Sequence, residues 1–132
     1  MILVDANVLI DLLWRDPAWF SWSSAQLAEA ANSGPIGINA IIYAEISVPF
    51  ASEADLDEIL SAAGLLRLEL PYQAGFLAGK AFQLYRKRGG TRTSPLPDFY
   101  IAAHAAVIGA TLLTRDPSRH QSYFPSVPVI AP

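Results

Sequence analysis

The chain has 132 residues, a length typical of a single domain with a hydrophobic core. Hydrophobic residues make up 52% and charged residues 16%, which excludes a disordered chain, and the absence of cysteine excludes disulfides and thiolate chemistry. The apolar N-terminus has no basic leading segment and is interrupted by Asp5 and Asp11, so it predicts neither a signal peptide nor a membrane span. We therefore expect one domain over residues 1–132, in a soluble cytoplasmic protein.

Charge is distributed unevenly, although the net charge is only −3. Residues 1–79 carry ten acidic and two basic residues, or −8, whereas residues 80–132 carry two acidic and seven basic residues, or +5. This asymmetry predicts a basic surface on an otherwise acidic protein. Such a surface is compatible with a polyanionic partner.

Short apolar runs alternate with helical patterns along the chain. The first 32 residues predict a strand at 2–4, a helix that continues through Leu13, and a helix from Asp16-Pro17 to about Asn32. A strand at 36–38 follows, and then a helix that is capped by Asn39 and stopped by Pro49. The next helix runs from Ser52 or Asp55 to Gly64. The second part predicts a strand at 65–70, a long helix from Pro71 to Gly89-Gly90, a loop at 89–97, a helix from Asp98 to Gly109, and strands at 110–114 and 127–130. This alternation favours an α/β fold with a mainly parallel sheet and helices on both faces.

Two aspartates follow predicted strands. Asp5 comes directly after the strand at 2–4, and Asp116 follows the strand at 110–114 with one residue between them. Ligands of parallel α/β sheets bind at the carboxyl ends of the strands, where both aspartates lie if these strands are parallel. Aspartate is also common in turns and at helix starts, so either position taken alone is equally compatible with a capping role.

Glu45 interrupts an apolar helix. It shares a helical face with Ile41, Ile42 and Val48, and we expect this face to pack on the sheet. An unpaired carboxylate at such a position costs free energy on the order of several kcal/mol. Only two basic residues in the first 79 positions are available to pair with it. We therefore favour a functional role for Glu45.

Asp98 follows a proline-rich loop and precedes a helix, which is the usual place of an N-cap. A capping carboxylate can also bind a metal, because it has two oxygens. Several carboxylates in one site repel one another and raise each other's pKa unless a cation joins them. The chain offers only two histidines, His104 and His120, so an oxygen-rich site points to Mg²⁺ or Mn²⁺ rather than Zn²⁺.

The order of these residues resembles that of PIN-domain ribonucleases. The chain has D-x-N after the first strand, a glutamate within an apolar helix, and PDFYIAAHAAVIGATLLTRD across the late helix and strand. Within that family, the size and the ending FPSVPVIAP are most similar to the VapC toxins of bacterial toxin–antitoxin pairs. The resemblance spans nearly the whole chain and implies a three-layer α/β/α sandwich with a mainly parallel central sheet.

By position, the catalytic and metal-binding quartet of the family falls on four acids of this chain, namely Asp5, Glu45, Asp98 and Asp116. Asn7 and Thr114 match polar positions that support this site. The chain departs from the family pattern at Ala6, where threonine or serine is common, and at Asn39-Ala40, where a hydroxyl-bearing residue is usual.

The resemblance implies an endoribonuclease in which Mg²⁺ or Mn²⁺ activates a water molecule for in-line attack on an RNA phosphodiester. It also implies a cognate antitoxin that covers the site, a homodimer, and no membrane association. An aromatic cluster between the first two predicted helices could form an exposed patch for such a partner, and it comprises Trp14, Trp19, Phe20 and Trp22.

Basic residues near the quartet are candidates for contacts with RNA phosphates. Arg92 lies in the loop before Asp98, and Arg115 adjoins Asp116, where an ion pair is an equal alternative. Outside the quartet, we expect His104 to be packed or half-buried, and we expect His120 in a solvated loop and Asp11 on a solvated face, a cap or a turn.

Two other functions stay open at this stage. A catalytically inactive PIN-like module that acts only in binding or regulation would have the same fold, but it has no reason to keep four mutually repelling acids. A haloacid-dehalogenase-like phosphatase also has an aspartate after its first strand. That chemistry requires a second aspartate two residues later, where this chain has Asn7.

Overall fold

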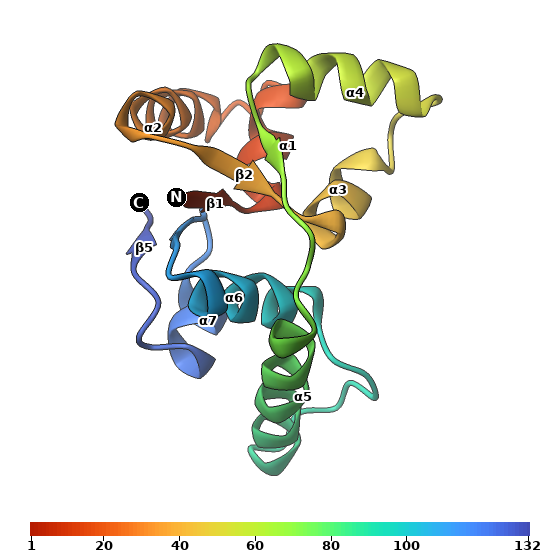
Figure 1. The fold of residues 1–132 in the computed structure, drawn as a ribbon, viewed down its shortest axis with the longest axis vertical. Coiled ribbons are helices and arrows are strands. Elements are labelled where there is room, and N and C mark those ends of the chain that lie inside the picture. Colours follow the sequence, from red (N-terminus) through yellow and green to blue (C-terminus); the bar gives the residue numbers. More distant parts are fainter.

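The computed structural model describes residues 1–132 and contains five strands and seven helices (Figure 1). The strands are β1 (Ile2–Val4), β2 (Ile36–Ile38), β3 (Leu66–Arg67), β4 (Thr111–Leu113) and β5 (Val129–Ile130). The helices are α1 (Ala6–Leu13), α2 (Phe20–Ser33), α3 (Ala40–Ser47), α4 (Glu53–Ala62), α5 (Tyr72–Lys87), α6 (Pro97–Ile108) and α7 (Ser118–Tyr123).

The five strands form one sheet in the order β3-β2-β1-β4-β5. All four pairings are parallel, so the predicted mainly parallel sheet is confirmed. The chain leaves β1 toward β2 on one side and later returns to β4 on the other side of β1. The direction of winding therefore reverses between β1 and β4, and the carboxyl ends of strands at such a reversal are where ligands bind in open α/β sheets.

The helices form a layer on each side of the sheet. Figure 1 shows α1 to α4 on one side and α5 to α7 on the other, as expected for right-handed crossover connections. Side chains of the central strands fill the core between the layers and are at most 1% exposed: Leu3, Val4, Ile38, Leu112 and Leu113. Burial of each such side chain stabilises the fold by about 1.5–3 kcal/mol. The three-layer α/β/α sandwich in a single domain is thus confirmed.

Helix α3 begins at the predicted cap. The Asn39 side-chain oxygen accepts a hydrogen bond from the Ile42 N–H at 3.0 Å, and the Asn39 amide nitrogen lies 3.0 Å from His104 Nδ1 on α6. His104 is 1% exposed, so the expectation of a packed histidine is confirmed. Asn39 therefore caps α3 at the position where a hydroxyl-bearing residue was expected from the resemblance, and its side chain also links α3 to α6.

Helix α6 is positioned by its first turn and its last residue. Pro97 occupies the first helical turn and Leu96 the N-cap position, so Asp98 lies within the first turn and is not itself the cap. The neighbouring Phe99 is buried, and its ring packs edge-on against Tyr123 of α7 at a centroid distance of 5.0 Å. At the other end, Gly109 adopts φ +67°, the left-handed conformation expected of a glycine that closes a helix.

Several element boundaries differ from the prediction. Helix α2 begins at Phe20 and not at Asp16-Pro17, because the Asp16 carboxylate binds the N–H groups of Ala18 and Trp19 in a separate turn. The strand predicted at 65–70 is only two residues long, since β3 is an edge strand that pairs with β2 alone. Helix α7 lies in a segment predicted as a loop.

The predicted aromatic cluster is only partly exposed. Trp14 is 62% exposed, whereas Trp19 and Trp22 are half-buried and pack edge-on at a centroid distance of 6.2 Å. Phe20 is half-buried beneath the Arg15 guanidinium. No helix combines the length and the apolar character that crossing a membrane requires.

Candidate active site

Asp5 lies between β1 and α1, at the reversal of the sheet. Its Oδ1 accepts a hydrogen bond from the Ala6 N–H at 2.7 Å, and its Oδ2 accepts one from the Thr114 hydroxyl at 2.8 Å. The same Oδ2 lies 3.2 Å from Nε2 of His120. Asp5 is 4% exposed. The buried aspartate is therefore held in one orientation by α1, β4 and α7.

Asn7 and Thr114 connect α1 with the segment that follows β4. The Asn7 side-chain nitrogen donates to Thr114 Oγ1 at 3.2 Å, and its oxygen accepts from the Arg115 N–H at 3.0 Å. Thr114 Oγ1 also accepts a hydrogen bond from the Asp116 N–H at 3.2 Å. Asn7 reaches Asp5 itself at 3.5 Å, so both predicted supporting residues contact the first aspartate.

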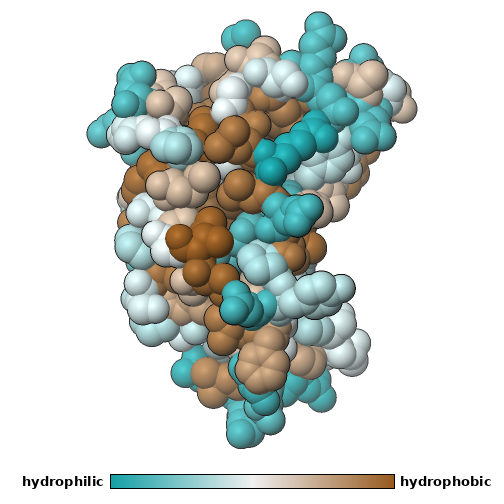
Figure 2. All heavy atoms as spheres, viewed as in Figure 1, coloured by the Kyte–Doolittle hydropathy of each residue, from teal (hydrophilic) through white to brown (hydrophobic).

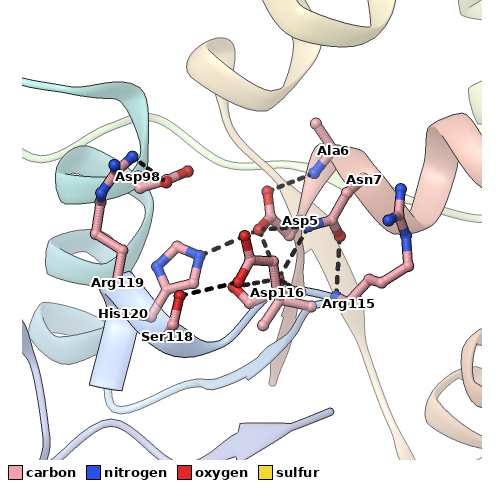
Figure 3. Close-up of polar contacts among 10 residues, drawn as sticks. Asp5, Ala6, Asn7, Asp98, Arg115, Asp116, Ser118, Arg119 and His120 are labelled. Atoms are coloured by element: carbon pink, nitrogen blue, oxygen red, sulfur yellow. Dashed lines mark hydrogen bonds and ion pairs between the residues drawn. The ribbon is translucent and has the colours of Figure 1, made fainter. Parts of the chain in front are cut away.

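Three side chains from distant parts of the chain converge on one space. Asp5, Asp98 and His120 each offer one ligand atom, and these atoms lie within 4.8 Å of one another. Figure 3 shows the three residues approaching from the end of β1, from α6 and from α7. This arrangement brings together two of the predicted acids and a histidine that the sequence analysis had set aside.

His120 is where the sequence prediction was wrong. It is 2% exposed and lies on α7, because this short helix packs its ring against the end of the sheet rather than leaving it in a solvated loop. Its Nδ1 atom is buried and has no hydrogen-bond partner. Asp116-Pro117 lies directly before α7, but the same pair of residue types at Asp16-Pro17 does not open α2, so the pair alone does not identify the helix.

Glu45 faces the same site from α3. Its Oε1 atom is buried without a hydrogen-bond partner. Burial raises the pKa of Glu45 from its ordinary 4.5 to about 7, and the negative charges of Asp5 and Asp98 contribute to this increase. The apolar face predicted around Glu45 exists only in part. Ile42 is fully buried, but Val48 is 83% exposed, because it lies beyond the last turn of α3.

The Asp116 side chain makes its hydrogen bond outside the cluster of Asp5, Asp98 and His120. Its side chain is exposed, and its Oδ1 accepts a hydrogen bond from the Ser118 hydroxyl at 3.0 Å. It is not among the residues whose ligand atoms lie within 4.8 Å of one another. The structure therefore brings Asp5 and Asp98 together, turns Glu45 toward them, and leaves Asp116 at the rim.

Asp11 is buried and not solvated, contrary to the sequence analysis. It is 1% exposed, and its Oδ2 accepts hydrogen bonds from the Ser23 hydroxyl at 2.7 Å and from Arg115 Nε at 2.9 Å. The Arg115 guanidinium also lies over the ring of Trp19, 5.4 Å from its centroid. Of the two alternatives for Arg115, the structure shows the ion pair, formed with Asp11 and not with Asp116.

One other arginine contacts the site, and another lies in the loop before α6. Arg92 is exposed in the loop before α6, and its backbone N–H donates to the Tyr85 hydroxyl at 3.2 Å. That hydrogen bond lowers the pKa of Tyr85, and the charge of the nearby Arg119 adds to the effect. Arg119 was not singled out from the sequence. Its Nη1 lies 3.1 Å from Asp98 Oδ2 (Figure 3).

The donor atoms fit a divalent cation. Two carboxylates and an imidazole can share one coordination sphere, and the buried, unpaired Oε1 of Glu45 lies beside them. Without a cation, the three carboxylates repel one another, and this repulsion adds to the effect of burial in raising the pKa of Glu45. An oxygen-rich set of this kind favours Mg²⁺ or Mn²⁺.

A surface hollow beside α3 does not contain these acids. A cavity of about 430 Å³ is lined by residues of β2, α3 and the segment after β3, among them Asn39, Tyr43 and Leu68. Figure 2 shows a concave outline between the part of the molecule that contains α3 and the part that contains α6. The converging carboxylates thus belong to a site at the end of the sheet, separate from this mainly apolar cavity.

Comparisons with known proteins agree with this arrangement. The matching family model is the PIN domain, over residues 2–122. The fold is similar to VapBC2 from Rickettsia felis bound to a promoter DNA fragment, with a TM-score of 0.76, 22% identity, and coverage of 99% of this chain and 98% of that chain. It is also similar to VapBC-1 from nontypeable Haemophilus influenzae, with a TM-score of 0.73, 23% identity, and coverage of 99% and 98%.

A third similar structure is DNA-bound VapBC from Salmonella typhimurium, with a TM-score of 0.69, 21% identity, and coverage of 98% of this chain and 96% of that chain. At such identities these likenesses show the fold alone. A comparison with curated protein sequences gives no match. The family model, however, covers all but the first residue and the last ten, and the chain therefore belongs to the PIN domain family.

Proposed function

We propose that this protein is a metal-dependent endoribonuclease that hydrolyses RNA phosphodiester bonds. The observation that carries this proposal is the convergence of Asp5, Asp98 and His120 within 4.8 Å, with the unpaired oxygen of Glu45 facing them. Membership of the PIN domain family supports the same conclusion. A buried cluster of like charges weakens the fold, so its presence is best explained by a cation that the protein binds.

In the proposed site, Asp5, Asp98 and Glu45 hold Mg²⁺ or Mn²⁺, and Asp116 joins them after its side chain turns away from Ser118. Such a cation supplies Lewis-acid stabilisation of phosphate charge and lowers the pKa of water. The role of Thr114 and Asn7 is to hold Asp5 in the correct orientation, because both direct hydrogen-bond donors toward Asp5 Oδ2.

Arg92 is the stronger of the two predicted phosphate contacts. It is exposed in the loop that leads into α6, close to Asp98 in the chain. Arg115 is bound to Asp11 and covered in part by Trp19, so its guanidinium is already engaged. The positive charge of residues 80–132 supports a polyanionic substrate that approaches the side of the site formed by α6 and α7.

The proposed biological role is that of the toxin in a type II toxin–antitoxin pair. The similar structures are VapBC proteins, and another is described as a toxin–antitoxin complex from Klebsiella pneumoniae, with a TM-score of 0.63. A cognate antitoxin and a homodimer are accordingly proposed, and the exposed Trp14 is a candidate contact for either. A monomer in light scattering that forms no complex with the product of an adjacent gene would contradict these assignments.

The test is cleavage of structured RNA by the purified protein with Mg²⁺, with Mn²⁺, and with EDTA. We expect cleavage only with a divalent cation, and we expect Asp98→Asn to remove it. The products should carry a 5′ phosphate and a 3′ hydroxyl, since water and not the ribose 2′ hydroxyl is the proposed nucleophile. Cleavage that persists in EDTA would refute metal dependence.

The same assay separates the two alternatives. An inactive module would bind Mn²⁺ without cleaving RNA under any condition. A phosphatase would release phosphate from a small phosphomonoester and leave RNA intact. The structure does not favour the phosphatase, because position 7 carries an amide that is engaged by Thr114 and the Arg115 N–H.

A further inference from the structure

Arg119 forms the one ion pair in which a proposed metal ligand contacts an arginine. Its Nη1 lies 3.1 Å from Asp98 Oδ2, and both side chains remain substantially exposed, at 46% for Arg119 and 34% for Asp98. Figure 3 shows the guanidinium extending from α7 across to Asp98 on α6. The pair is therefore accessible to ions and to substrate.

This ion pair places a positive charge on a carboxylate that the proposed site assigns to a cation. A carboxylate oxygen bound to a guanidinium is less available as a metal ligand, and a nearby positive charge repels a divalent cation. Exposed ion pairs contribute little to stability, so this one is easily exchanged. The buried contacts of Asp5, by contrast, come from neutral groups and from His120, which do not leave the site.

We propose that Arg119 alternates between two anionic partners, Asp98 in the metal-free protein and a phosphate of the RNA backbone in the metal-bound protein. Arginine suits this exchange, because its planar guanidinium binds carboxylate and phosphate oxygens in the same forked geometry. Its position on α7, directly before His120, keeps the side chain beside the cluster in both arrangements. This inference rests on the proposed nuclease function and identifies a substrate contact of the same site.

The exchange makes two predictions of opposite sign for Arg119→Gln. Without the competing guanidinium, the variant should bind Mn²⁺ about two- to fivefold more tightly than the wild type, the range that corresponds to an exposed ion pair. The same variant should bind RNA more weakly in the presence of Mn²⁺. Loss of one phosphate contact to a single strand should reduce the slope of log affinity against log salt concentration by about 0.7.

The experiment uses the full chain and a short single-stranded RNA with phosphorothioate linkages, which slow hydrolysis. Mn²⁺ affinity is measured by calorimetry, and RNA affinity by fluorescence anisotropy over a range of salt concentrations, with Mn²⁺ and with EDTA. Arg67→Gln is the matched control, since Arg67 forms another exposed arginine–aspartate pair, with Asp57. Arg119→Lys retains the charge and should restore most of the salt slope. Circular dichroism checks that each variant is folded.

The results separate this inference from the function on which it rests. If the wild type binds neither Mn²⁺ nor RNA, both the nuclease assignment and the inference fail. If the wild type binds both ligands and Arg119→Gln matches Arg67→Gln in both affinities, the exchange is refuted and the nuclease assignment stands. Weaker Mn²⁺ binding by Arg119→Gln would also refute the exchange, because it would show that Arg119 supports the metal site instead of competing with it.

Discussion

Nε2 of His120 lies 3.2 Å from Oδ2 of Asp5, across 115 positions of sequence. Both residues are nearly inaccessible to solvent, at 2% and 4% exposure. The contact links α7 with the end of β1, so the short helix near the end of the chain completes a site that begins at the fifth residue. It also places an imidazole among carboxylates that otherwise repel one another.

We predict that His120→Gln weakens Mn²⁺ binding by about 10- to 100-fold, the usual effect of removing a partner of a metal-binding carboxylate. The contact to Asp5 is lost or lengthened, and the buried carboxylate then has fewer groups to hold it in position. Calorimetric titration with Mn²⁺ measures the effect. His104→Gln, a change of another buried histidine that lies outside the cluster, is the control and should leave the affinity nearly unchanged. Equal affinities for wild type and His120→Gln would contradict this role.

Thr114→Val should reduce both stability and metal affinity. Valine has nearly the shape of threonine but cannot donate to Asp5 Oδ2 or accept from the Asp116 N–H. Loss of a hydrogen bond to a buried, charged acceptor costs about 1–3 kcal/mol in the free energy of unfolding. Urea unfolding of Thr114→Val and of Thr111→Val, a similar change within β4, measures the difference. A comparable loss in both variants would indicate a general packing effect and no specific support of Asp5.

Arg115→Met should destabilise the fold by about 3 kcal/mol, because it leaves the buried Asp11 without its basic partner. Arg67→Met removes an arginine from an exposed pair and should have little effect. Denaturant unfolding of the two variants compares a buried with an exposed ion pair in one protein. If the two variants were equally stable, Arg115 would not be the partner that stabilises Asp11.

Glu45→Gln should stabilise the metal-free protein while it abolishes metal-dependent activity. Burial of Glu45 and the charges of Asp5 and Asp98 both oppose its ionisation, so a neutral amide removes a desolvation cost as well as repulsion. Because part of the side chain contacts solvent, we expect a modest increase in melting temperature, about 2–4 °C at neutral pH in EDTA. Differential scanning calorimetry tests this. A decrease in melting temperature would mean that the Glu45 carboxylate stabilises the folded protein, and it would contradict the prediction that this carboxylate destabilises the metal-free fold.

Acidification should destabilise the protein through His104. Burial lowers the pKa of His104 below its ordinary 6.5, so the folded protein keeps the imidazole neutral while the unfolded chain binds a proton below that pH. The contribution of His104 to stability is therefore present above pH 6.5 and is lost as the pH falls below it. The free energy of unfolding of His104→Gln should decline less between about pH 7 and about pH 5 than that of the wild type. Parallel pH profiles would contradict the assignment.

The fold was largely predictable because its strands and helix starts carry strong local signals. The ILV and IGI runs, the Asn39 cap and the closing Gly109 all act where they were predicted. The incorrect predictions concern elements whose length or existence depends on contacts with other segments of the chain. Strand β3 is short because it has a partner on one side only, and α7 is too short for a helical repeat to be recognised.

The site was predictable in part for the same reason. Asp5 and Asp98 follow from element order and from the resemblance to the family, because each adjoins the end of a strand or the start of a helix. His120 and Asp11 were misassigned because their burial depends on packing between α7 and the sheet, and between α1 and α2. Those contacts join residues far apart in sequence, such as Asp11 and Arg115, so a local sequence pattern does not predict them.

We propose that acids from the end of β1, from α3 and from α6 bind one divalent cation. Titration of the wild type, Asp5→Asn and Asp98→Asn with Mn²⁺, monitored by electron paramagnetic resonance, tests it most directly. We expect one Mn²⁺ site in the wild type and at least about a tenfold loss of affinity in each variant. Unchanged Mn²⁺ affinity in both variants, with the fold intact, would show that these aspartates do not bind the cation.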